Sequence, residues 1–303
     1  MARACADGSA RRRPAAFPLP GWQAETAAGH DGGVIRELPR VVPAPPGKPV
    51  REEAARSQER ARRLAERPGT WDRAQAAAMQ ADFDAAAAGW EASRGGYRPA
   101  VLADALARGG PFSPGPAVEI ASGTGLLTPL IAAVWPQVAA VDLSAGMLAR
   151  SAAAARVQAD AARLPLADGC AAAVVIGDGP LFAAETVRVM APGAVLVWSN
   201  ALGDGAPFFV PVDVLAAVMA ATGRSWDVVH SQAHWGSWAV LRPAGLPGDP
   251  RRRTRDDGRR APSRPIPVTE RSRGISKPGP AGYPLPRRAR PSDLCAHNSP
   301  YEA

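Results

Sequence analysis

The sequence contains few residues of the kinds that cross-link a protein or anchor it in a membrane. Its three cysteines, Cys5, Cys170 and Cys295, lie far apart without metal-ligand spacing. Neither a disulfide framework nor a zinc site is therefore indicated, and we expect no bound metal. No run of 18 apolar residues is present, and the first 20 residues lack a continuous apolar core. We therefore expect a soluble cytoplasmic protein with no membrane partner.

Positive charge is scarce in the middle of the chain. The net charge of +8 comes from the ends, because residues 97–242 hold 8 arginines, no lysine and 10 acidic residues. A protein that reads nucleic acid normally carries a positive stripe on its folded surface. We interpret the arginine runs at 11–13 and 251–253 as solvated tails. The alternative is a weak, salt-sensitive anchor for RNA, DNA or acidic lipid.

Hydrophobic periodicity is missing from both ends of the chain. Residues 1–48 are rich in Pro, Gly, Ala and Arg, and residues 243–303 contain 12 Pro and 6 Gly. Both segments are predicted to be disordered tails. Residues 49–69 include a helix-forming stretch with little apolar face, interpreted as a charged solvated helix or a linker. We expect one folded domain over residues 70–242.

The rest of the chain is organised around residues 117–128, AVEIASGTGLLT. A short apolar run of strand type breaks into Ser122-Gly123-Thr124-Gly125 before a helical segment that begins near Leu126. Glycines without a Cβ allow a tight turn and let a ligand lie against the backbone. The unpaired N–H groups of the following helix favour an anionic or polar ligand group.

Glycine spacing distinguishes two cofactor classes. The dinucleotide pattern G-x-G-x-x-G needs a third glycine where this chain has Leu126, which weakens that interpretation. The segment instead resembles motif I, E/D-x-G-x-G-x-G, of class I S-adenosylmethionine-dependent methyltransferases of the type 11-like kind. Ala121 replaces the first glycine, at a cost of about 1 kcal/mol if that position needs a positive φ. The resemblance implies a cofactor site lined by Glu119, Ala121, Ser122, Gly123, Thr124 and Gly125.

Three later segments resemble further motifs of the same family. The segment VDLSAGML, residues 141–148, resembles the second motif. This resemblance implies that Asp142, with Leu143 beside it, accepts the ribose hydroxyls and that Met147 packs on the adenine. Ser144 is a plausible N-cap. Residues 157–169 resemble GDAxxLPFxDGxFD, which implies that Asp160 meets the adenine amino group and the Ala161 N–H a ring nitrogen.

The fourth segment completes the expected fold. A buried strand ending at Gly177, also assigned to the cofactor site, precedes residues 185–198, which resemble ExxRVLxPGGxLVxS. Two β-rich runs at 226–230 and 235–242 suit a terminal antiparallel hairpin. The resemblance thus implies an α/β fold, a Rossmann-like doubly wound seven-stranded sheet with a C-terminal antiparallel hairpin, and S-adenosyl-L-methionine as cofactor.

Aromatic residues upstream and downstream are candidates for the pocket. Met79, Phe83, Ala86 and Trp90 fall at helical spacing, and the family usually covers the cofactor mouth with helices here. Trp90 or Tyr97 then lines the pocket; the alternative is packing against the sheet. An apolar acceptor pocket could use the following side chains, although core packing explains each as well: Phe182, Phe208, Phe209 and Trp235.

Methyl transfer chiefly requires alignment of the acceptor with the sulfonium methyl group. Where a general base helps, Asp178 is the first candidate, ahead of His230 and His234. Because no long insertion separates the motifs, a small-molecule acceptor leads. The alternatives are methylation of nucleic acid or protein docked by the basic tails, and a non-catalytic cofactor-binding or interaction protein. No sequence feature indicates an oligomeric state.

Overall fold

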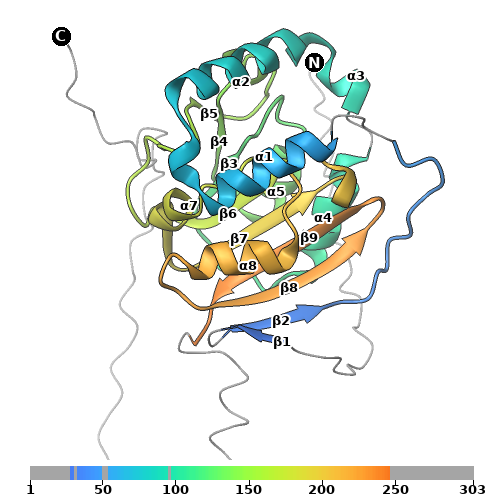
Figure 1. Ribbon diagram of the computed structural model, residues 1–303, viewed down its shortest axis with the longest axis vertical. Helices are drawn as coiled ribbons and strands as arrows, with labels where there is room; N and C mark the ends of the chain where they lie inside the picture. Colours follow the sequence, from blue (N-terminus) through green and yellow to red (C-terminus); the bar gives the residue numbers. More distant parts are fainter. Residues whose placement is uncertain (1–27, 31–32, 50–53, 95–96, 246–303) are drawn as a thin grey trace, which may run out of the picture.

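A nine-stranded mixed sheet forms the centre of the molecule (Figure 1). The computed structural model describes residues 28–30, 33–49, 54–94 and 97–245. Across the sheet the strands follow the order β1-β2-β8-β9-β7-β6-β3-β4-β5. Their bounds are β1 Ala28–His30, β2 Gly33–Glu37, β3 Ala117–Ile120, β4 Val138–Asp142, β5 Ala155–Gln158, β6 Ala171–Gly177, β7 Met190–Asn200, β8 Trp226–Ala233 and β9 Gly236–Pro243.

Five parallel strands, β3 to β7, make up the part of the sheet that positions the site. Strands β3 and β6 are apolar runs that are almost entirely buried, as expected where helices cover both faces of a parallel sheet. Strand β3 pairs with β4 on one side and with β6 on the other. The chain therefore reverses its winding at β3, and such a switch point opens a crevice at the carboxyl ends of the strands.

Strand β9 lies between β7 and β8 and is antiparallel to both. The predicted Rossmann-like fold with a C-terminal antiparallel hairpin is confirmed. The prediction of seven strands is wrong, because β1 and β2 extend the sheet beyond β8 and bring it to nine strands. The hairpin turn between Ala233 and Gly236 lies at the same edge of the sheet as the end of β7, because Asn200 pairs with Ser237.

Helices cover the two faces of the sheet and one of its edges. Their bounds are α1 Ala54–Glu66, α2 Arg73–Ala86, α3 Trp90–Arg94, α4 Arg98–Arg108, α5 Thr128–Val134, α6 Ala145–Leu148, α7 Ala183–Val189 and α8 Val212–Ala220, with short 3-10 turns η1 Pro68–Thr70, η2 Ala87–Gly89 and η3 Gly203–Gly205. None of the helices in these described ranges is long and apolar enough to cross a membrane.

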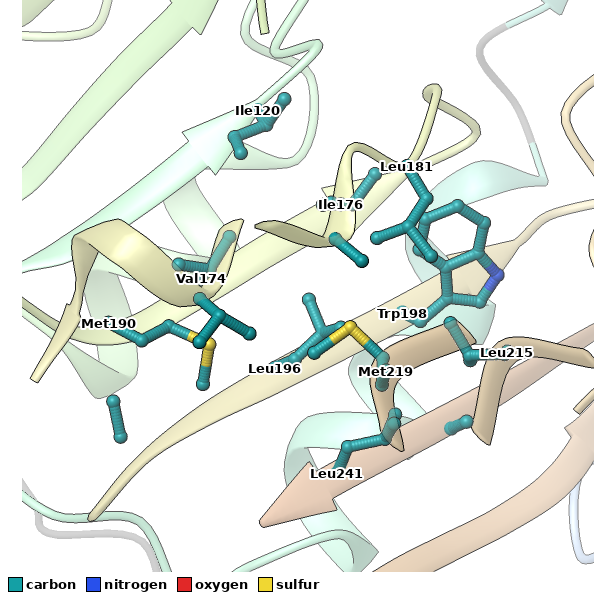
Figure 2. Close-up of a cluster of buried hydrophobic side chains, with 14 of the residues drawn as sticks. Ile120, Val174, Ile176, Leu181, Met190, Leu196, Trp198, Leu215, Met219 and Leu241 are labelled. Carbon is teal, nitrogen blue, oxygen red and sulfur yellow. The ribbon is translucent and has the colours of Figure 1, made fainter. Parts of the chain in front are cut away.

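Two hydrophobic cores hold these layers together. On one face, α7 and α8 pack on the sheet through residues such as Leu215 and Met219, which meet Leu196 and Trp198 of β7 (Figure 2). On the other face, α4 and α5 contribute Leu102 and Ile131 to a second core. The strands between the cores are thereby fixed from both sides, which makes their carboxyl ends a rigid base for a site.

The N-terminal part differs from the tail predicted for residues 1–48. Strand β2 is a parallel neighbour of β8, with Ile35 opposite Val228. The proline- and glycine-rich composition around this strand gave no sign of it. Its five residues are stabilised by pairing with β8, which comes near the end of the domain in the sequence. Of the predicted tails, 1–48 and 243–303, residues 1–27, 31–32 and 246–303 lie outside the described residues.

Helix α1 also differs from the solvated helix predicted for residues 49–69. Ala61, Leu64 and Ala65 are buried, and α1 packs against α8. Their i, i+3, i+4 spacing gives one narrow apolar stripe, which suffices because α8 offers an apolar surface opposite. The expected lower bound of the domain, residue 70, remains a prediction, although β2 and α1 pack onto this fold.

Candidate functional site

The loop after β3 has three residues in the left-handed region of backbone space. Ala121 has φ 58°, Gly123 56° and Gly125 80°. Position 121 therefore does need a positive φ, and the alanine adopts it. A Cβ placed on Gly179 would lie 2.6 Å from the Cβ of Ala121, so the glycine at 179 makes room for the alanine at 121.

Two hydroxyl groups of this loop are buried without a hydrogen-bond partner in the described part of the chain. They are Ser122 Oγ and Thr124 Oγ1, on residues that are only 7% and 6% exposed. A buried hydroxyl without a partner costs free energy, and native structures rarely leave one so. The loop is therefore suited to bond a polar ligand placed against it.

Asp142, at the end of β4, faces the same loop. Its Oδ2 accepts from the N–H of Gly123 at 2.7 Å, and its Oδ1 from the N–H of Ser144 at 2.8 Å. Burial raises the pKa of Asp142, while these backbone hydrogen bonds oppose the rise. The Leu143 N–H also hydrogen-bonds this carboxylate, which leaves about one of its four lone-pair sites to accept a ligand hydroxyl. The predicted Ser144 N-cap is confirmed by its bond from the Met147 N–H at 3.0 Å.

Glu119 lies beneath the loop. It is 2% exposed, and its Oε2 accepts from Thr128 Oγ1 at 2.5 Å, in the first turn of α5. Burial raises the pKa of Glu119 to about 7. The carboxyl group is consequently about half ionised at neutral pH, and a cation bound above it would favour the ionised form.

Helices α2 and α3 close over the loop from one side. Asp84 of α2 accepts from Ser144 Oγ at 2.5 Å and from the Gly146 N–H at 2.8 Å, and these bonds lower the pKa of Asp84. Beside them, Ala87, Trp90 and Met147 form a buried cluster, and the partly buried Phe83 packs against it. The Trp90 indole nitrogen lies 3.9 Å from a Cβ placed on Gly123. Trp90 thus packs in a helical cluster and also adjoins the loop.

Asp178 follows β6 with φ 53°. Its Oδ2 pairs with Arg98 Nε at 3.1 Å and its Oδ1 accepts from the Ala201 N–H at 3.0 Å. The guanidinium of Arg98 in turn lies over the Trp90 ring, 5.6 Å from its centre. Because both oxygens of Asp178 have partners, its first role is to hold Arg98 and the β7 end, and its role as general base stays a prediction.

Asp160, after β5, has two partners. Its Oδ1 accepts from the Ala162 N–H at 2.9 Å, and its Oδ2 from the Trp71 indole N–H at 2.9 Å. The following loop is fixed by Arg188, which donates to the carbonyls of Leu164 and Leu166 at 2.9 and 2.7 Å. Glu185 and Asp168 raise the pKa of Arg188, which is therefore always charged.

The remaining predicted cofactor residues lie near the same edge. Gly177 ends β6 at a point where an added Cβ would contact Leu127 of the loop. Leu143 follows Asp142, and its carbonyl accepts from Gln158 Nε2 at 3.2 Å. Ala161 follows Asp160 and is half-buried. The Tyr97 ring lies beside that of Trp235 at the hairpin turn, with ring centres 5.5 Å apart, and its place in the cofactor site stays a prediction.

The predicted acceptor-side residues are divided between two places. His234 and Trp235 occupy the β8–β9 turn with ring centres 4.4 Å apart, and Phe208 and Phe209 are half-buried in the segment before α8. Phe182 instead contacts Trp71, with ring centres 5.7 Å apart. His230 lies within β8, where burial lowers its pKa, and its place in the strand suits a structural role.

Sequence reasoning missed Trp71 and Arg98, because both lie outside the motif segments. Arg188 could have been found, since it is the arginine of the ExxR pattern. Within the described ranges, no group of three or more His, Cys, Asp or Glu side chains could hold a metal ion.

Comparison with known families agrees with this geometry. Residues 118–198 match the family model for a methyltransferase domain, and this span includes the glycine loop, Asp142 and Asp160. Over this span the chain is similar to a methyltransferase domain. The glycine loop with its two unpartnered hydroxyls and the Asp142 carboxylate fit a ligand that carries hydroxyl and charged groups.

Several solved methyltransferase structures are similar to this chain. A chain of the complex between the Haloferax volcanii Trm112 methyltransferase activator and a methyltransferase is 13% identical, with a TM-score of 0.47, covering 54% of this chain and 98% of its own. The DhpI complex with S-adenosylhomocysteine is 22% identical, with a TM-score of 0.45 and 55% and 96% covered. A Thermotoga maritima methyltransferase is 17% identical, with a TM-score of 0.44 and 53% and 98% covered. A search of curated proteins found no match.

Proposed function

We propose that this methyltransferase domain transfers the methyl group of S-adenosylmethionine to a small-molecule acceptor. The observation that carries the proposal is the glycine loop, where two buried hydroxyls without partners stand beside Asp142. Glu119, ionising near neutral pH beneath this loop, suits a cofactor that carries positive charge. The three parts converge at the carboxyl end of the central strand, which is the usual place for a ligand in such sheets.

Each cofactor-binding residue has a proposed task. Asp142 would accept a ribose hydroxyl through its free lone pair, and Asp160 the adenine amino group, with the Ala161 N–H donating to the ring. The loop residues 121–125 would lie against the methionine part, with Ser122 and Thr124 donating from their hydroxyls. Met147 would pack on the adenine from the α6 side. When bound, the cofactor supplies an activated methyl group on a sulfonium.

On the acceptor side, the protein's task is to orient the nucleophile and exclude water. The Nε of Arg98 donates to Asp178, and the Arg98 side chain is 14% exposed. It is therefore fixed within the crevice between Trp90 and the β6 end. Held in this way, Arg98 and Asp178 would act as a rigid wall that orients the acceptor, and orientation alone supplies as much as about 7–11 kcal/mol of a barrier.

The short connections between strands support a small acceptor. Residues 121–137, 143–154, 159–170 and 178–189 link β3 to β7, and each connection has at most one short helix. Within this part of the chain no added module covers the site, and α2 and α3 already close one side of it. A small molecule needs no larger surface than this.

Calorimetric titration of S-adenosylhomocysteine into the full chain tests the cofactor site. Wild type should bind, and Asp142→Asn should bind roughly 10- to 100-fold more weakly, because hydrogen bonds to a charged group are worth about 1.5–3 kcal/mol. Asp82→Asn, an exposed aspartate of α2, is the matched control and should bind like wild type. A wild type that binds neither this ligand nor S-adenosylmethionine would refute the proposal.

The acceptor class is tested separately, by release of S-adenosylhomocysteine in the presence of a small-molecule panel, total RNA or a protein extract. Turnover with small molecules by the full chain, unchanged when residues 246–303 are removed, supports the proposal. Turnover that requires RNA or protein, and falls on removal of this arginine-rich segment, would favour the alternative of a docked macromolecule.

A further inference from the structure

Trp71 lies between two parts of the adenine side of the site. It follows η1 and precedes α2, and it falls outside residues 118–198 of the family match. Its indole N–H donates to Asp160 Oδ2 at 2.9 Å, and its ring centre is 5.7 Å from that of Phe182. Asp160 follows β5, whereas Phe182 follows the loop after β6. Trp71 therefore bridges the two loops on either side of the β3 and β4 ends.

The Asp160 carboxylate retains capacity for a ligand while Trp71 is in place. An ionised carboxylate offers about four lone-pair sites. The Ala162 N–H takes one on Oδ1 and the Trp71 indole one on Oδ2. One site on each oxygen is left, and the two existing bonds fix the plane of the carboxylate.

We propose that Trp71 is a positioning residue of the adenine subsite, whose indole N–H orients Asp160 so that its remaining lone pairs accept the exocyclic amino group. This inference rests on the proposed function, because it takes Asp160 as the adenine partner. It assigns recognition of the base in part to a residue that lies 47 positions before the family match begins.

The structure holds Trp71 firmly enough for this role. Before it, α1 is docked by its buried Leu64, and Gln58 Nε2 donates to the Ala206 carbonyl at 3.1 Å. After it, Asp72 and Gln75 form a capping box that fixes the start of α2. The indole is thus anchored on both sides along the chain, and the Arg60 guanidinium lies 5.9 Å from its ring centre.

The other side of the contact is equally fixed. The loop after Asp160 is bonded to α7 through Arg188 and through the Leu164 N–H, which donates to Glu185 Oε1 at 2.5 Å. The backbone around Asp160 is therefore rigid, and the free variable is the rotation of its carboxylate. The indole N–H sets that rotation together with the Ala162 N–H.

The test compares two ligands with the full chain. S-adenosylhomocysteine carries the amino group, and S-inosylhomocysteine carries an oxygen in its place. In wild type the first ligand should bind more tightly. Trp71→Phe keeps a ring but removes the N–H, and it should weaken binding of the adenine ligand roughly tenfold while leaving the inosine ligand unchanged. The affinity ratio of the two ligands should therefore fall roughly tenfold.

Trp135→Phe is the matched control. The Trp135 indole N–H donates to the Ser113 carbonyl at 3.0 Å, away from the site, so its removal should leave the ratio at the wild-type value. Thermal unfolding verifies that each variant is folded. If Trp71→Phe does not fold, Trp71→Met, which fills the space with a flexible apolar chain, takes its place.

Two results would overturn the inference. An equal loss for both ligands would mean that Trp71 is only a wall of the pocket. Tighter binding of the adenine ligand by Trp71→Phe would mean that the indole competes with adenine for Asp160. Absence of binding by wild type would be a failure of the proposed function itself, and the inference would fall with it.

Discussion

Ala121→Gly is the substitution whose sign the structure predicts most sharply. Ala121 has φ 58°, and an L-residue in this left-handed conformation costs about 1–2 kcal/mol. Glycine removes that cost but adds about 0.4–1 kcal/mol of unfolded-state entropy. It also removes a half-buried methyl group, which is worth less than the roughly 0.8 kcal/mol of full burial. We expect a net stabilisation of about 0.5 kcal/mol.

The control is Ala85→Gly in α2, where the alanine is exposed and helical. There the same change should destabilise by about 1 kcal/mol. The two variants should thus differ by about 1.5 kcal/mol in the free energy of unfolding, measured in denaturant at one temperature. Ala121→Gly should still bind S-adenosylhomocysteine at least as well as wild type.

A destabilisation of Ala121→Gly as large as that of Ala85→Gly would refute this reasoning. It would mean that the contact of the Ala121 methyl group with Gly179 outweighs the backbone strain. The alanine in the glycine motif would then be a packing residue in its own right.

Two further predictions concern the buried carboxyl group of Glu119 and the pairing of β2 with β8. The Glu119 pKa near 7 lies above its ordinary 4.5, so the folded state holds more protons between these values. Wild-type stability should fall by about 3 kcal/mol as pH rises through that window. Glu119→Gln should lack this fall when unfolding free energies at pH 5 and pH 8 are compared. Gly33→Ala should destabilise by about 1–3 kcal/mol, because its Cβ would overlap the Trp226 carbonyl oxygen. Hydrogen exchange of β8 should rise in this variant.

Each of these two predictions can be refuted by one result. A Glu119→Gln variant with the same fall in stability as wild type would mean that another group titrates in this window. For Gly33→Ala the control is Gly69→Ala, where an added Cβ meets nothing within 4 Å. Equal stability of these two alanine variants would mean that β2 is not held against β8.

Local patterns in the sequence predicted the central sheet and most of the cofactor loop. The apolar run before Ser122, the acidic end of β4 and the Ser144 cap are each set by residues close in sequence, so one stretch contains the whole signal. The same holds for the hairpin of β8 and β9. The fold class follows from these because a parallel strand needs a helical crossover, which restricts the topology.

The rest depended on contacts between distant segments. Strand β2 is held in the sheet by β8, almost 200 positions later. Helix α1 is held by two buried alanines and one buried leucine, an apolar stripe too small to predict burial from the sequence. Arg98 and Trp71 acquire their roles from Asp178 and Asp160, 80 and 89 positions away. No periodicity in the sequence records such pairs, because the segment around each residue carries no pattern that points to its distant partner.

The pairing of β2 with β8 has a consequence for the order of folding. During synthesis β1 and β2 emerge before the other strands of the sheet, yet β8, the partner of β2, is completed only after Ala233 has been made. Closing a loop of this length is slow compared with local helix formation. The segment made first is therefore the last to join the sheet, and until then the edge of β8 stays available to a strand of another chain.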